Sequence, residues 1–471
     1  MKRQYDSQYD KMTQMPVPNL VVNLAIPTTI SMMVAFIYNI VDTYFVSQLG
    51  TSAAAATGVV FALMFIIQAF GFLLGHGAGS NISRKLGARN PDDAKKYSAT
   101  SFYLAIVCGL FIMTVGILFL DPLMTLLGST DTILPFSREY GKYILIAAPA
   151  TAGSNVLSNI LRYEGKATYS MFGMMAGSLL NILGDYIFIF VLDMGITGAG
   201  LSTTISFFIS MMVLLIPFIS GKTQSSLNIK FISLNTILLW NIVTVGFPSM
   251  VRQGLNSIST MILNLMAAPF GDAAIAAMSI VSRVGGIIFC ICLGIGQGFQ
   301  PVVAFNYGAK KFKRVRESFN FTVKLNTIVI TILSLIVLLV SKDIIALFRD
   351  DADVIRIGVF ALQAQCVSMI LQPLTMCGNM MFQSIGKSGT ALFLSCQRSG
   401  LFFIPIIIVL SKTIGITGIQ LSQPIADVFA AIVTTPFIIH FFRHLPKEDM
   451  EIGHERTPYN RVSSETDIIS D

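Results

Sequence analysis

The feature that most constrains the fold is a series of long apolar runs recurring from Pro16 to His440. A helix needs about 20 residues to cross a hydrocarbon core of about 30 Å, and about twelve runs reach that length. A helix also satisfies its own backbone hydrogen bonds, which is necessary because the hydrocarbon core offers no water as a partner. The predicted spans are 17–47, 53–80, 96–120, 134–161, 167–192, 196–219, 234–268, 273–305, 318–340, 357–381, 388–411 and 417–441. The sequence therefore predicts an all-α polytopic membrane protein with twelve transmembrane helices.

Charge is scarce and unevenly distributed. Only 12% of the residues are charged, and most of the Lys and Arg residues behind the net charge of +7 fall on one side of the predicted spans, in loops such as 84–96 and 310–316. Basic loops stay in the cytoplasm, so both termini are expected inside, in the cytoplasmic (inner) membrane of a prokaryote. The bias accounts for the positive charge without nucleic acid as a partner. The first fifteen residues lack the apolar core of a removable signal peptide.

Motifs of an enzyme are missing. The six Cys form no CxxC pair, the four His make no ligand spacing with a carboxylate, and the sequence has neither a phosphate-binding loop nor GxSxG. We therefore expect no enzymatic activity, no cofactor, and no metal beyond a possible sodium ion at the cation site described below.

The second half of the chain repeats the first. A shift of 221 residues superposes Pro27 on Pro248, and a one-residue slip aligns "GITGAGLST" with "GITGIQLSQ". An even number of spans separates the copies, so both run the same way across the membrane, as in parallel-repeat transporters whose lobes rock around a midplane site. Duplication that only helps packing is the alternative. The predicted segments are a cytoplasmic tail (1–15), an N-lobe (16–219), a cytoplasmic linker (220–232), a C-lobe (233–442) facing the N-lobe across a central cleft, and a disordered cytoplasmic tail (443–471).

Embedded acids mark the N-lobe. Asp42 and Asp185 lie roughly 10 Å below the outer ends of their predicted helices, at the level of Thr203. Asn181 precedes Asp185 by four residues and so shares its helix face. A carboxylate at such depth costs roughly 2.5–3.5 kcal/mol, so it needs a partner or a purpose. These oxygens suit a hard monovalent cation, and two neighbouring carboxylates equally suit a proton relay. A polar cross-link between helices is the structural alternative.

The remaining embedded charges predict different roles. Asp427 and Arg398 reach similar depth on adjoining helices, which predicts a structural ion pair. The N-lobe holds two embedded acids and no embedded base, so a cation would prefer it. Pro27 interrupts the first helix, where Pro27, Tyr38 and Asn39 are expected as hinge or supporting residues; a fixed bend at Pro27 is an equal alternative.

The chain resembles a transporter family along nearly its whole length, from about residue 15 to 442. The resemblance rests on the duplicated twelve-span plan and on "VDTYFVSQLG", "GAGSNISRKLGAR" and "SRVGGIIFCICLGIGQGFQPVVAFNYGAKKFKRV". These segments are similar to the multidrug and toxic-compound extrusion (MATE) transporters. The resemblance implies export of organic cations and amphiphilic drugs, driven by inward sodium or proton movement. One bacterial and archaeal branch has an N-lobe cation site, and Asp42, Asn181, Asp185 and Thr203 match its positions.

The sequence thus predicts a secondary active multidrug efflux transporter, associated with antibiotic resistance, in which two lobes rock as drug and ion exchange. Its expected partners are small cationic or amphiphilic substrates and the lipid bilayer, and the expected state is a monomer. A flippase for lipid-linked oligosaccharide or lipid is the alternative within the same wider fold. The missing buried base in the N-lobe argues against it, because a pyrophosphate needs cations.

Overall fold

A computed structural model describes residues 8–450, and these are almost entirely helical. The elements of the first half are α1 (Gln8–Gln14), α2 (Val17–Ser47), α3 (Thr51–Gly87), α4 (Pro91–Leu118), α5 (Leu120–Leu126), α6 (Leu134–Tyr163), α7 (Ala167–Asp185), the π-helix η1 (Tyr186–Val191) and α8 (Gly195–Ile219). Those of the second half are η2 (Ile229–Phe231), α9 (Thr236–Ala267), η3 (Ala268–Phe270), α10 (Asp272–Gly308), α11 (Phe312–Leu339), α12 (Ser341–Phe348), α13 (Ala352–Met369), α14 (Gln372–Ile385), α15 (Ser388–Cys396), the π-helix η4 (Gln397–Phe402), α16 (Phe403–Thr413) and α17 (Ile416–His444). The predicted all-α architecture is confirmed.

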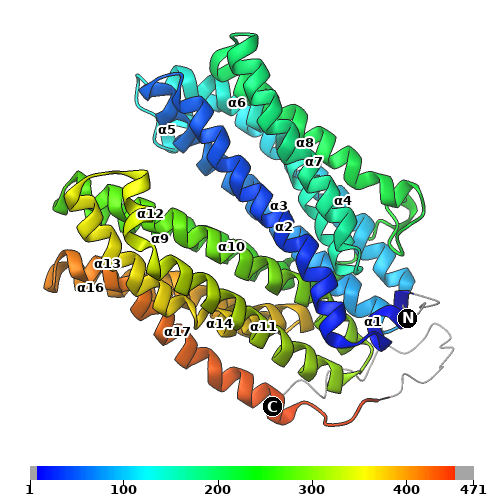
Figure 1. Ribbon diagram of the computed structural model, residues 1–471. Coiled ribbons are helices and arrows are strands. Elements are labelled where there is room, and N and C mark those ends of the chain that lie inside the picture. The colour runs from blue at the N-terminus through cyan, green and yellow to red at the C-terminus, as the bar shows by residue number, and fades with distance from the viewer. Residues whose placement is uncertain (1–7, 451–471) are drawn as a thin grey trace.

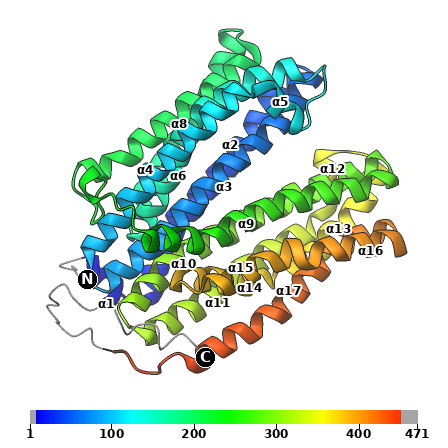
Figure 2. The same ribbon diagram turned by 180° about the vertical axis from the view of Figure 1, so that it is seen from behind.

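The helices form two bundles arranged as a V. Figures 1 and 2 show the N-lobe (α2–α8) and the C-lobe (α9–α17) meeting at the end where the marked N and C positions lie, which we name the termini end. The lobes diverge toward the opposite end, named the far end, which carries α5 and α12. Across the junction α2 packs against α10 and α3 against α9.

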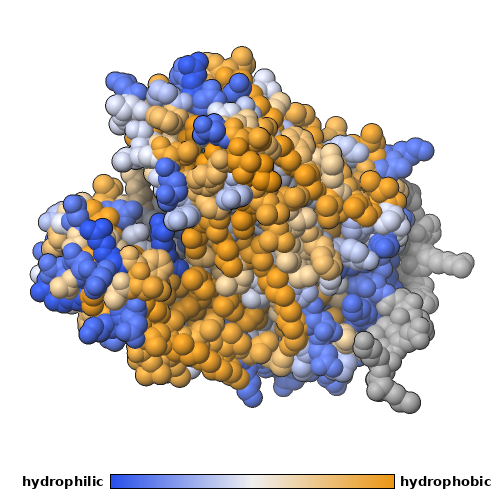
Figure 3. All heavy atoms as spheres, turned by 45° about the horizontal axis from the view of Figure 1, so that its top comes forward, coloured by the Kyte–Doolittle hydropathy of each residue, from blue (hydrophilic) through white to orange (hydrophobic). Residues whose placement is uncertain are grey.

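The bundles have the dimensions and surface of a membrane protein. Among residues 8–450, eleven helical segments are long and apolar enough to cross a membrane. The remaining predicted span is α9, which at 32 residues is about 48 Å long but carries polar side chains such as Arg252 and Gln253 toward the space between the lobes. Apolar residues cover much of the face shown in Figure 3, and Phe111 and Leu339 are 67% and 81% exposed. An apolar surface of this extent needs hydrocarbon to cover it.

The repeat is visible in the backbone. Gly50 and Gly271, which the 221-residue shift superposes, precede the first residues of α3 and α10 with φ of 116° and 91°. L-residues with side chains rarely adopt these angles, so glycine is required at both turns. The turn that starts the second helix of each lobe is therefore the same.

A set of glycines lets the lobes touch at the termini end, and we name it the glycine seal. A methyl group on Gly77 would overlap the carbonyl oxygen of Ile242, and one on Gly298 would overlap the backbone of Ala25. These are equivalent contacts of the two halves. The glycine seal consists of Gly77, Gly87, Gly246, Gly294, Gly298 and Gly308, each facing backbone of the opposite lobe. Small residues of this kind allow helix backbones to approach closely.

Residues 8–14 and 443–450 are more ordered than the sequence indicates. Residues 8–14 of the predicted N-terminal tail form α1, where Met12 is fully buried. Helix α17 continues to His444, and the backbone N–H of Met450 donates to Lys310 O at 3.1 Å. The predicted disorder is therefore wrong for residues 443–450, because they pack against the start of the α11 region. Residues 1–7 and 451–471 lie outside the described part of the chain.

The linker between the lobes is held by an acid that the sequence reading missed. Glu164 is fully buried after α6, and its carboxylate accepts hydrogen bonds from the backbone N–H groups of Gln224 (3.1 Å) and Ser225 (2.7 Å). Lys166 lies 3.5 Å from the same carboxylate. Glu164 lies just past the predicted span 134–161 and after the end of α6, so a search for acids inside the spans does not find it.

Candidate functional site: an oxygen cluster beside a central cavity

A cavity of about 1220 Å³ lies between the lobes. Figure 3 shows a hollow between the two masses, away from the grey terminal residues. The wall is largely apolar, with side chains from both lobes. Its larger apolar residues include Met32, Phe36, Phe61, Phe65, Phe70, Phe72, Met174, Phe207, Met250, Met261, Leu265, Phe289 and Leu293. A wall of Phe and Met adapts to ligands of different shape.

The four residues predicted to bind a cation come together on one side of this cavity. Asp42 on α2, Asn181 and Asp185 on α7 and Thr203 on α8 are all buried, and none is more than 3% exposed. Asn181 Nδ2 donates to Thr203 Oγ1 at 3.0 Å, and the Asp42 and Asp185 carboxylates interact with each other. We name these four residues the N-lobe oxygen cluster. Asn181 and Thr203 also line the cavity, so the cluster adjoins it.

Three oxygens of the cluster have no hydrogen-bond donor. Both carboxylate oxygens of Asp185 and the amide oxygen of Asn181 are buried and accept no hydrogen bond of good geometry, although the Asp185 carboxylate faces the Ser202 hydroxyl and the Asp42 carboxylate. The nearby Ser202 hydroxyl donates to the Asn181 backbone carbonyl instead, at 3.0 Å. A buried acceptor without a donor costs about 1–3 kcal/mol, and more when it is charged. A bound cation or proton would remove this cost.

A tyrosine that sequence reasoning missed completes the cluster. Tyr140 on α6 is fully buried, and its hydroxyl donates to the two carboxylate oxygens of Asp42 at 3.2 and 3.4 Å. Asp42 therefore has a donor where Asp185 has none. No signal in the sequence points to Tyr140, since it lies on a different helix from every acid of the cluster.

The helix that carries Asp185 changes its geometry immediately after it. Helix α7 ends at Asp185, and the next six residues, Tyr186–Val191, form a π-helix. Such π-helical segments are rare and often occur at functional sites, because the extra residue re-aims side chains. This widening follows directly on the carboxylate with the unpartnered oxygens.

The predicted supporting residues occupy two different regions. Tyr38 and Asn39 line the cavity, and the Tyr38 hydroxyl interacts electrostatically with both carboxylates of the cluster. Pro27 is buried inside α2, fifteen residues before Asp42 and thus about 22 Å along the helix. Its carbonyl accepts the Ser31 hydroxyl at 2.9 Å. A hinge at Pro27 would act through the helix and not by contact with the cluster.

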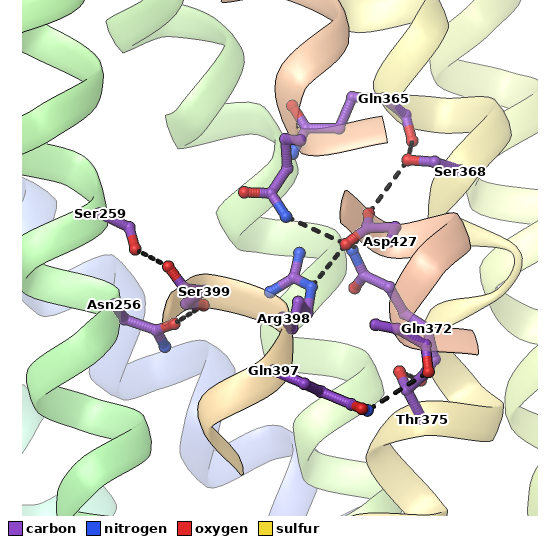
Figure 4. A network of polar contacts seen from close by, with 12 residues as sticks. Asn256, Ser259, Gln365, Ser368, Gln372, Thr375, Gln397, Arg398, Ser399 and Asp427 are labelled. Carbon is purple, nitrogen blue, oxygen red and sulfur yellow. Dashed lines mark hydrogen bonds and ion pairs between the residues drawn. The ribbon is translucent and has the colours of Figure 1, made fainter. Parts of the chain in front are cut away.

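In the C-lobe, the buried carboxylate of Asp427 is fully hydrogen-bonded (Figure 4). Arg398 Nε donates to Asp427 Oδ1 at 2.7 Å, and the same oxygen accepts Gln423 Nε2 at 3.0 Å. The second oxygen accepts the Ser368 hydroxyl at 3.1 Å and Gln372 Nε2 at 3.3 Å. This carboxylate has a cation and three neutral donors, so it has no oxygen left for an ion.

One expectation about the N-lobe is wrong. Arg162, in the last turn of α6, is only 3% exposed and lines the cavity. The predicted span ended one residue earlier, which placed this arginine in a loop. The N-lobe therefore does contain a buried base, and it lies toward the termini end of the cavity together with the buried His76.

Comparisons with known proteins agree with this architecture. The MatE family model matches residues 27–187 and again residues 248–409, two copies that begin at Pro27 and Pro248. The chain belongs to the MatE family. It is 28% identical over 439 residues to the multidrug export protein MepA of Staphylococcus aureus (strain MSSA476), covering 93% of this chain and 97% of that one. As a family member, it is a multi-pass membrane protein of a transporter family.

Solved structures give the same result for the fold. A multidrug-resistance MATE transporter of the MOP superfamily in an outward-facing conformation is 26% identical and has a TM-score of 0.89, with 94% of this chain and 100% of that chain covered. A MATE structure in the straight conformation is likewise 26% identical with a TM-score of 0.89, covering 95% and 100%.

Proposed function

We propose that this MatE protein is a secondary active multidrug exporter that exchanges amphiphilic drugs for sodium ions or protons bound at the N-lobe oxygen cluster. The observation that carries the proposal is the set of three buried, unpartnered oxygens on Asp185 and Asn181. Carboxylate, amide and hydroxyl oxygens are the ligands that hard cations prefer. The proposal draws its substrate class from the name of the S. aureus relative and from the Phe- and Met-rich cavity.

The repeat supports a dedicated role for the cluster. The C-lobe equivalents of Asp42 and Asp185 are Leu263 and Ile406, which pack in an apolar core of that lobe. A carboxylate pair needed only for packing would be expected in both copies. Its restriction to one lobe fits an ion site, which has to be present once.

The position of the cluster gives a route for coupling. Asn181 and Thr203 belong both to the cluster and to the cavity wall, so an ion that draws their oxygens inward changes the wall that a drug contacts. Each ligand then alters the affinity of the other, and such coupling is reciprocal. With the termini in the cytoplasm, the conformation in Figure 1 opens outward, where the ion enters and the drug leaves.

Transport in proteoliposomes tests this function. Purified protein is reconstituted, and ethidium efflux is measured with a sodium gradient and a proton gradient imposed separately. One gradient should drive wild-type efflux, Asp185→Asn should abolish it, and Asp131→Asn, a change of an exposed loop acid, should leave it intact. Full efflux by Asp185→Asn would contradict the proposal.

A flippase for lipid-linked oligosaccharide or lipid is the second candidate. The buried Arg162 removes part of the argument against it, because an N-lobe base is present. The oxygen cluster still favours the exporter, since a pyrophosphate would not need unpartnered carboxylates. Scrambling of a fluorescent polyprenyl-linked sugar by the reconstituted protein, with no drug efflux, would decide for the flippase.

A further inference from the structure

The charges on the cavity wall have one sign. Among the lining residues that the structure describes, Arg162 and Arg252 are charged, and no Asp or Glu is present. The acids Asp42 and Asp185 lie behind the wall, where Asn181 and Thr203 separate them from the cavity. A ligand in the cavity therefore meets positive charge directly.

Arg162 has no acidic partner within the described residues. Its two terminal nitrogens donate to the amide oxygens of Asn159 and Gln297, and its Nε has no acceptor. No carboxylate lies within ion-pair distance of it in residues 8–450, while the ring of Tyr163 lies 6.0 Å away. A desolvated cation with only neutral partners is costly, and an anion would offset that cost.

Arg252 repeats this arrangement from the opposite lobe. It projects from α9, and its terminal nitrogens donate to Asn379 Oδ1 at 3.0 Å and Ser249 Oγ at 3.4 Å. It too forms no ion pair with any acid in the described part of the chain. Both guanidinium groups interact electrostatically with the same two residues, His76 and Tyr163. The two arginines therefore approach one region from both sides.

Arg398, by contrast, forms an ion pair with a buried carboxylate. Its Nε lies 2.7 Å from Asp427, in the network of Figure 4. Arg162 and Arg252 instead each use neutral oxygens and leave further N–H groups free, since a guanidinium carries five. Neutral acceptors fix the direction of an arginine without neutralising its charge. Arg162 and Arg252 are therefore held in place with their charges available to an anionic ligand.

From this geometry we infer that Arg162 and Arg252 form an oxyanion subsite at the termini end of the cavity, which binds a carboxylate or phosphate group of an amphiphilic ligand. The inference rests on the proposed function for the site as a whole and specifies which ligands it takes. Ligands that carry an anionic group beside their apolar body should bind more tightly than purely cationic ones. Because the arginines come from different lobes, one oxyanion bound by both would also hold the lobes together at the termini end.

The test compares ligands that differ in a single charge. Binding of ciprofloxacin, which carries a carboxylate, and of its methyl ester, which does not, is measured by ligand fluorescence with the full-length protein in neutral-lipid nanodiscs. The acid should bind at least about tenfold more tightly, as expected for a charge-assisted contact. Arg252→Gln and Arg162→Lys should reduce that preference. Lysine is chosen at position 162 because it keeps the buried positive charge, so the variant can fold even if Arg162→Gln does not. The exposed Arg283→Gln on α10 is the matched control.

Dioleoyl phosphatidic acid added to the nanodiscs distinguishes the two sources of the anion. If the lipid displaces ciprofloxacin from the wild type but not from Arg252→Gln, the occupant is a lipid phosphate. If the preference for ciprofloxacin depends on the arginines but the lipid does not displace the drug, the occupant is the drug carboxylate. Equal binding of acid and ester, with no effect of either arginine on any ligand, would overturn the subsite. Ethidium efflux from proteoliposomes that contain the same variants separates failure of the subsite from failure of the exporter. Efflux without anion preference refutes only the subsite, and preference without efflux refutes only the transport function.

Discussion

The two lobes bury carboxylates at membrane depth and treat them in opposite ways. In the C-lobe, Asp427 accepts hydrogen bonds from Arg398 and three neutral side chains. In the N-lobe, neither oxygen of Asp185 accepts a hydrogen bond of good geometry, and Asp42 accepts one from the Tyr140 hydroxyl and faces the Asp185 carboxylate. Two copies of one fold thus hold a saturated acid and an unsaturated one. The difference teaches that depth alone does not single out a candidate ion site, and that the hydrogen-bond donors around each carboxylate oxygen must be compared as well.

The largest effect is expected from a change of the N-lobe acid that lacks donors. Asp185→Asn removes the charge that would bind the coupling ion and keeps the shape of the side chain. We expect gradient-driven drug efflux to fall to background, with little loss of stability, because the change adds a donor to a site that lacks one. Efflux from everted vesicles and the thermal unfolding midpoint in detergent measure the two quantities.

On the saturated side, Asp427→Ala should cost stability. Breaking a buried pair leaves Arg398 uncompensated, at a cost of about 3–5 kcal/mol, whereas the double variant Asp427→Leu/Arg398→Met should cost less because it removes both charges. Thermal unfolding of the purified variants compares them. A double variant less stable than the single one would mean that the network is more than a structural pair.

The glycine seal is where the lobes are alike, so equivalent changes should have equal effects. Gly77→Ala and Gly298→Ala each place a methyl group against backbone of the opposite lobe, at a cost of about 1–3 kcal/mol. Both should shift spin-label distances across the termini end toward larger separation. Gly389→Ala, which meets open space, is the control. A shift from only one of the pair would show that the halves are not equivalent there.

The most local expected effect concerns Tyr140. Tyr140→Phe removes the donor of Asp42 and makes the two N-lobe acids more alike. One hydrogen bond to a charged group contributes about 1.5–3 kcal/mol, so the apparent affinity for the coupling ion should change by about tenfold or more. Drug efflux measured against ion concentration gives this value. An unchanged ion dependence would place Tyr140 outside the ion site.

Much of this structure could be predicted from the chain alone. Apolar runs predict the crossing helices because lipid permits few alternatives, and the matched prolines and glycines predict the duplication. The proximity of Asp42, Asn181, Asp185 and Thr203 followed from their shared depth and from the spacing on α7. Their role as an ion site stays a prediction.

The features that the sequence did not predict depend on packing between helices. Tyr140 reaches Asp42 of α2 from α6, a helix that packs mainly on α3, α8 and α4, and no spacing in the sequence reports that contact. Arg162 and Glu164 lie at a helix end, where a boundary error of a residue decides whether a charge is assigned to water or to the interior. The π-helices after Asp185 and around Arg398 are likewise invisible to a pattern that assumes α-helical spacing.

The glycine seal also bears on the ancestry of the chain. Gly77 of the first half contacts the second half through the same kind of surface that Gly298 of the second half presents to the first. An interface in which each partner offers the same patch is isologous, the arrangement found in two-fold symmetric dimers. A single half of this chain, before duplication and fusion, would therefore already have carried both sides of the joint. In the present chain the linker anchored by Glu164 joins the two halves, which share the glycine contacts but differ in the charges they bury.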